Sequence, residues 1–156
     1  MLLRKHQKLI ALSAAILISC FLLLAIYGKV FHPSEKLKKL EYGVSFFEIF
    51  FIITLLFYRN NWRIWVITAA IFASFAGYSI FWYSIELPCA CMGTLIPHAS
   101  SLYFFLDLIF FILSLSVAYL LQIKHSALYF WGFLGGVFCL IGYAFAEKVY
   151  QKFILL

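Results

Sequence analysis

Five long apolar runs divide the chain, and they constrain its fold more than any other feature of the sequence. They cover residues 9–27, 42–58, 64–85, 102–121 and 127–146. Each run is close to the ~17–25 residues that a helix needs to cross the hydrocarbon core of a bilayer. Because an open sheet edge would leave backbone groups unpaired in lipid, the runs predict five transmembrane helices.

The composition agrees with an integral membrane protein. Hydrophobic residues make up 66% of the 156 residues, against about 45–50% in a soluble domain. The charged residues cluster between the apolar runs, so the net charge of +6 indicates membrane flanks rather than a nucleic-acid surface. We predict one membrane domain over residues 1–156, with the lipid bilayer as a partner and no nucleic acid.

The first run follows Arg4, Lys5 and Lys8, as the apolar part of a signal peptide does, and Cys20 ends a lipoprotein-like box. However, the run continues beyond Cys20, whereas a mature lipoprotein normally begins with a polar tether. We therefore predict that the first helix is retained and that Cys20 is a small buried residue.

Small residues at four-residue spacing predict where helices approach one another closely. They occur in the first, third and fifth runs: Ala11, Ala15 and Ser19, then Ala69, Ala73 and Gly77, then Gly132 and Gly136. Aromatic residues predict the membrane interfaces, with Trp62 and Trp65 at one and Trp82 and Tyr83 at the other.

The orientation is not decided by the number of basic residues, because alternating spans place six Lys or Arg on each side. The basic N-terminus and the absence of Lys and Arg from residues 84–101 favour a cytoplasmic N-terminus and an outer location for that connection. The remaining outer lysines fit a short interfacial helix over residues 34–41, capped by Ser34, with Leu37, Leu40 and Val44 on one face.

The third connection carries two cysteines, Cys89 and Cys91, between Pro88 and Gly93. A disulfide between residues so close in sequence requires a tight turn and is strained, and strained disulfides are easily reduced. The pair therefore suits the exchange of electrons at an oxidising membrane face better than it suits structural stabilisation.

Alternation of the spans brings other ionisable residues to the same side. Lys29 ends the first run, Glu48 lies inside the second and Asp107 inside the fourth. Charged residues within a span are costly and are candidates for function. Lys29 would favour a reactive thiolate, and Glu48 could pair with Lys29 or handle a proton. Asp107 is interpreted mainly as a residue that orients its helix.

The cysteines have two further interpretations. A zinc site from Cys89, Cys91 and His98 lacks a clear fourth ligand, so His98 is interpreted as a solvated loop residue. Cys139 lies in the middle of the fifth run without an evident partner and is interpreted as a packing residue.

These elements together resemble the MauE/DoxX family of redox-associated membrane proteins. The likeness covers about residues 9–121 and rests on Lys29 at the end of the first helix, Glu48 early in the second, and the Pro-Cys-x-Cys-x-Gly pattern of residues 88–93. The chain departs from the family in lacking an acidic residue soon after Lys29 and in its fifth run. The resemblance implies a bundle of four core transmembrane helices, here with a fifth C-terminal helix over residues 127–146.

The resemblance also implies periplasmic thiol–disulfide chemistry with a thioredoxin-like partner. The preferred hypothesis is an inner-membrane redox protein that uses Cys89 and Cys91 with Glu48 and Lys29. Such a protein could act as a thiol–disulfide oxidoreductase. The alternatives are a non-catalytic assembly factor or scaffold and a small proton-coupled transporter that uses Glu48 and Asp107. No cofactor is identified; a quinone could lodge between the aromatic-rich helices, but no motif indicates one.

Overall fold

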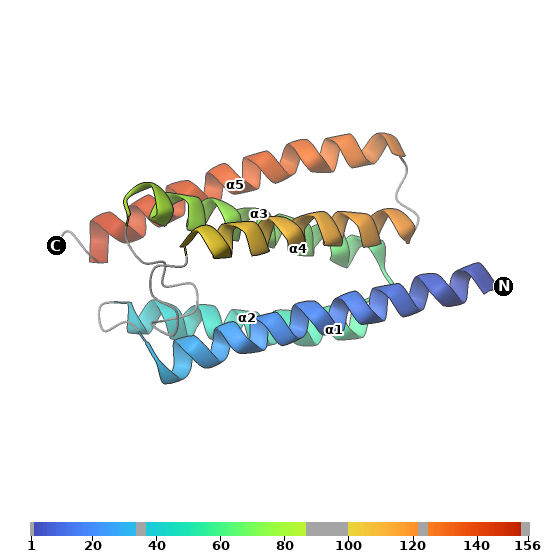
Figure 1. Cartoon of the computed structure of the whole chain (residues 1–156), viewed down its shortest axis with the longest axis horizontal. Helices are drawn as coiled ribbons and strands as arrows, with labels where there is room; N and C mark the ends of the chain where they lie inside the picture. Colours follow the sequence, from blue (N-terminus) through green and yellow to red (C-terminus); the bar gives the residue numbers. More distant parts are fainter. Residues whose placement is uncertain (1, 34–36, 87–99, 122–124, 154–156) are drawn as a thin grey trace.

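A computed structural model describes residues 2–33, 37–86, 100–121 and 125–153, and the regular structure in these ranges is entirely α-helical (Figure 1). The five helices are α1 (Leu2–Phe31), α2 (Lys38–Tyr58), α3 (Trp62–Ser84), α4 (Ser100–Leu120) and α5 (His125–Phe153). Each contains a stretch long and apolar enough to cross a membrane. The prediction of an all-α protein with five such helices is therefore confirmed.

Successive helices run in opposite directions, so the helix ends form two groups (Figure 1). One group holds the C-terminal ends of α1, α3 and α5 and the N-terminal ends of α2 and α4. We call this group the Lys29 end, because Lys29 lies in the last turn of α1. The two chain termini lie at opposite ends of the bundle, as an odd number of spans requires.

The bundle has two parts. Helices α1 and α2 form an antiparallel hairpin, and α3 packs on both α4 and α5 (Figure 1). The hairpin meets the other part through α1 against α4 and α2 against α3. Helix α5 is thus joined to the bundle through α3, as α4 is.

The contact between α3 and α5 depends on two glycines that allow the backbones to touch. A Cβ added at Gly77 would lie 1.8 Å from the carbonyl oxygen of Cys139, and one at Gly142 would lie 1.9 Å from that of Ser74. Such distances leave no room for any side chain, so these glycines fix how closely the two helices approach.

The small-residue prediction is confirmed for α3 and wrong for α5. Ala69 and Ala73 are buried, and Gly77 makes the close contact described above. A Cβ at Gly132 or Gly136 would meet nothing within 4 Å, because these residues lie on a face of α5 turned away from α3. In α1 the predicted small residues are also buried: Ala11, Ala15 and Ser19.

An aromatic cluster holds the hairpin against the other three helices. Phe21 of α1 packs against Phe110 of α4 and Phe72 of α3, with ring centroids 4.7 Å and 6.5 Å from its own. The rings of Phe72 and Phe110 are 5.1 Å apart. Because lipid is as apolar as these side chains, their contribution comes from close packing rather than from removal of water.

Two of the four predicted interfacial aromatic residues are internal, and Trp62 is half-buried. Trp65 and Trp82 are 0% and 1% exposed, so their assignment to the membrane interface is wrong. Trp65 lies close enough to the preceding turn for its indole Nε1 to donate to the carbonyl of Arg59 at 2.7 Å. Tyr83 is exposed, as an interfacial residue would be.

Two further predictions need correction. Cys20 is exposed on the surface of α1 rather than buried, because Ile18 and Ser19 of that turn face the core instead. Residues 38–41 do not form a separate interfacial helix but the first turn of α2. Leu37 is buried, because the apolar face of this turn continues along α2 into the bundle. Residues 34–36 lie outside the described ranges.

Candidate functional site

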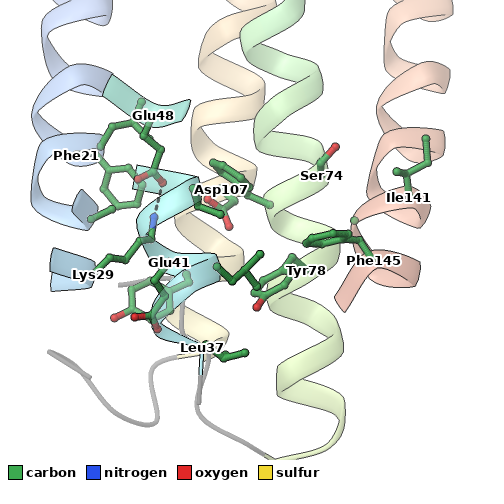
Figure 2. A pocket seen from close by; sticks show the side chains of 17 residues that line it. Phe21, Lys29, Leu37, Glu41, Glu48, Ser74, Tyr78, Asp107, Ile141 and Phe145 are labelled. Atoms are coloured by element: carbon green, nitrogen blue, oxygen red, sulfur yellow. Dashed lines mark hydrogen bonds and ion pairs between the residues drawn. The ribbon is translucent and has the colours of Figure 1, made fainter. Parts of the chain in front are cut away.

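Lys29 and Glu48 form an ion pair inside the bundle, where Lys29 Nζ donates to Glu48 Oε1 (Figure 2). The hairpin brings them together, since Lys29 lies in the last turn of α1 and Glu48 lies on the buried face of α2. Their relative exposures are only 4% and 3%. Because isolated charges are very costly in such surroundings, each group stabilises the charged form of the other.

The second carboxyl oxygen of Glu48 lacks such a partner. Glu48 Oε2 is buried and has no hydrogen bond to any group in the described part of the chain. A buried polar atom in this state is uncommon and calls for an explanation. The atom is an acceptor site that a bound donor could fill.

Asp107 provides a second carboxyl group at the same end of the bundle. It is 4% exposed, and the hydroxyl of Ser79 on α3 donates to its Oδ2 at 3.1 Å. Both Lys29 and Glu48 lie close enough to act electrostatically on Asp107. Asp107 therefore does more than orient α4, the role that the sequence favoured for it, because its hydrogen bond crosses to a neighbouring helix.

These groups surround a cavity of about 270 Å³ that all five helices line (Figure 2). Its acidic and basic lining residues are Lys29, Glu41, Glu48 and Asp107. The remainder of the wall is mostly apolar and aromatic. We call this space the central cavity. A largely apolar cavity with a few convergent polar groups is the usual form of a small-molecule site.

Glu41 was missed as a site residue, although the sequence contains a signal for it. Glu41 precedes Glu48 by seven residues, which is about two helical turns and therefore the same face of α2. It is 3% exposed and lines the central cavity. The shared face of Glu41 and Glu48 does not emerge from the sequence when residues 34–41 are interpreted as a separate interfacial helix.

Cys89, Cys91 and His98 lie outside the described residues, so the predicted disulfide and the zinc alternative stay predictions. The described residues that flank them are Glu86, which follows α3, and Ser100, which begins α4, and both of these helix ends belong to the Lys29 end. Glu86 follows α3 with a left-handed backbone, φ 56°, which is typical of a residue that ends a helix.

The other two cysteines are free thiols, Cys20 exposed and Cys139 half-buried. Cys139 packs its backbone on Gly77, which agrees with its interpretation as a packing residue. Within the part of the chain that the structure describes, no three His, Cys, Asp or Glu side chains are grouped so as to hold a metal ion.

No protein-family model, curated protein or solved structure matches this chain. The resemblance to the MauE/DoxX family therefore rests on the residues quoted for it. Of these, the structure brings Lys29 and Glu48 into direct contact.

Proposed function

We propose that this protein is a bacterial inner-membrane thiol–disulfide redox protein of the MauE/DoxX kind, with Cys89 and Cys91 as its exchange site at the periplasmic face. The observation that carries the proposal is the buried Lys29–Glu48 ion pair at the end of the bundle where Glu86 and Ser100 flank the cysteine segment. In this proposal Lys29 favours the thiolate form of an attacking cysteine, and Glu48 pairs with Lys29 or handles the proton.

The chemistry is a reversible dithiol–disulfide exchange with a thioredoxin-like protein. A thiolate of the reduced partner attacks one sulfur of the Cys89–Cys91 disulfide, forms a mixed disulfide and releases the other cysteine as a thiolate. The second partner thiolate then displaces the first cysteine. Two electrons pass to Cys89 and Cys91, the partner becomes a disulfide, and protons follow the released thiolates.

The proposed orientation has a cytoplasmic N-terminus. Because Lys29 is buried and paired with Glu48, it is not a flanking charge. Without it, the basic residues on the two sides number six and five rather than six and six, with the excess on the N-terminal side. This difference favours a cytoplasmic N-terminus and a periplasmic Lys29 end.

The four-helix core of residues 9–121 stays part of this proposal, with α5 as an addition to it. Since α5 packs on α3 through Gly77 and Gly142 and also lines the central cavity, we expect it to be required for the site.

Trapping of mixed disulfides tests the redox function. In cells that carry Cys91→Ser or Cys89→Ser, one variant should accumulate a mixed disulfide with a periplasmic thioredoxin-like protein, which is removed by reductant. Cys139→Ser is the matched control, since it removes a thiol that packs within the bundle and should leave trapping unchanged. If neither variant captures a partner and the redox state of periplasmic thiols is unaltered, the proposal is wrong.

A second candidate, a small proton-coupled transporter, is favoured by one observation: Glu48 and Asp107 come from different helices and line the same cavity. Carboxyl groups inside a membrane often carry protons. This function predicts proton-coupled uptake that is abolished by Glu48→Gln and retained in Cys89→Ser, the reverse of what the redox function requires.

A further inference from the structure

The central cavity has a strongly asymmetric lining. Its walls carry aromatic side chains from every helix except α2, including Phe21 of α1, Tyr78 of α3 and Phe145 of α5 (Figure 2). Its charged groups, Lys29, Glu41, Glu48 and Asp107, come from the hairpin and α4. A cavity with an apolar wall and charged groups at one side suits an amphipathic molecule better than it suits water or a hydrophilic solute.

The charged side of the cavity has more hydrogen-bond acceptors than the described protein groups satisfy. Two of the three carboxyl groups in the lining, Glu48 and Asp107, lie near the single ammonium of Lys29, which binds Oε1 of Glu48. Oε2 of Glu48 is buried without a hydrogen-bond partner among the described residues. Asp107 accepts from the neutral hydroxyl of Ser79 and forms no ion pair of its own among the described residues. A ligand that donates hydrogen bonds and carries positive charge would meet both needs.

We propose that the central cavity binds a small lipophilic amine, with its ammonium between Glu48 Oε2 and Asp107 and its hydrocarbon part against the aromatic wall. Aromatic faces attract cations as well as hydrocarbon, so the same wall accepts the carbons next to the ammonium. The volume of about 270 Å³ limits the ligand to a molecule of a few carbons and one ring. This site rests on the cavity alone and exists whether or not Cys89 and Cys91 exchange electrons.

Three probes with one hydrocarbon skeleton separate charge from shape: phenylbutylamine, phenylbutanol and phenylbutyrate. Their binding is measured by calorimetric titration of the full chain in nanodiscs at neutral pH, with empty nanodiscs giving the partition into lipid. We expect the amine to bind at least about tenfold more tightly than the alcohol, because it forms charge-assisted hydrogen bonds. The carboxylate should show no binding above that of the empty nanodiscs.

Two variants test whether the amine binds in the central cavity. Asp107→Asn keeps an acceptor for Ser79 and removes one charge, so it should weaken the amine about tenfold and leave the alcohol unchanged. Ala25→Leu fills space at the cavity wall and should weaken amine and alcohol alike. Glu147→Gln is the matched control, because it neutralises an exposed carboxylate on α5 and should alter neither affinity.

Three results would overturn the proposal. Equal affinities for amine and alcohol would show that the carboxyl groups do not select the ligand. Preference for phenylbutyrate would make Lys29 the anchor and the ligand an anion. Amine binding that survives Ala25→Leu would place it at the lipid surface. The comparison of the three probes on the unaltered chain decides the proposal even if Asp107→Asn does not fold.

Discussion

Lys29 on α1 and Glu48 on α2 are separated by 19 residues in sequence and joined by an ion pair whose side chains are 5% and 3% exposed. The pair closes the hairpin near the cavity and fixes which faces of the two helices meet. Both side chains are almost fully buried, so the charge of each is stabilised mainly by the other. This relationship links the folding of the hairpin to the properties of the site.

Removal of one member of this pair should be far more harmful than removal of both. We expect Lys29→Met to lower the free energy of unfolding by about 3–5 kcal/mol, because Glu48 is left charged and buried. The double variant Lys29→Met with Glu48→Met should recover to within about 1 kcal/mol of the original chain, since no charge is then stranded. Denaturant unfolding in detergent measures both.

Glu147→Gln is the control for this pair, because Glu147 is exposed on α5 and its loss should change stability by no more than about 0.5 kcal/mol. If the double variant loses as much as the two single variants added together, Lys29 and Glu48 contribute independently. The interpretation of a coupled pair would then be wrong.

The glycines of α5 offer a test with internal controls. Gly142→Ala should destabilise the protein by about 1–3 kcal/mol, because its Cβ would lie 1.9 Å from the carbonyl oxygen of Ser74 and would push α3 and α5 apart. Gly132→Ala and Gly136→Ala introduce the same group where nothing lies within 4 Å. They should be neutral or slightly stabilising, since Ala favours the helix. Equal loss in all three variants would contradict the packing described for α5.

The aromatic cluster should be required for the hairpin to stay on the other three helices. Phe72→Ala removes a fully buried ring that contacts Phe21 and Phe110. We expect a loss of about 2 kcal/mol or more, mainly from the void left behind. Phe57→Ala is the control, because Phe57 is 80% exposed and would face lipid. Thermal unfolding in detergent compares them, and similar losses would show that the cluster adds nothing beyond an ordinary lipid contact.

The number of helices and the grouping of their ends could be predicted from sequence, because span length and alternation depend only on the apolar runs. The pairing of Lys29 with Glu48 was also within reach, since few ionisable residues lie inside the spans and alternation places these two on one side. The cost of an unpaired charge in lipid makes such residues informative even without knowledge of packing.

The faces of the helices could not be predicted in the same way. In a soluble helix the apolar face is the buried face, but in a membrane both the lipid side and the core side are apolar. This is why Trp65 and Trp82 were assigned to the interface although they are core residues. It is also why Gly132 and Gly136 were favoured over Gly142, whose contact depends on the rotation of α5 about its own axis.

The location of the cysteine pair can be checked by labelling with a membrane-impermeant thiol reagent in a Cys20→Ser, Cys139→Ser background. If Cys89 and Cys91 form a disulfide at the periplasmic face, intact cells should be labelled only after treatment with reductant. Asn60→Cys in a chain without other cysteines is the control, because Asn60 is exposed in the connection between α2 and α3 at the opposite end of the bundle. It should be labelled only after the membrane is permeabilised. Labelling of Asn60→Cys in intact cells would reverse the proposed orientation, and labelling of Cys89 and Cys91 without reductant would show that the pair rests as a dithiol.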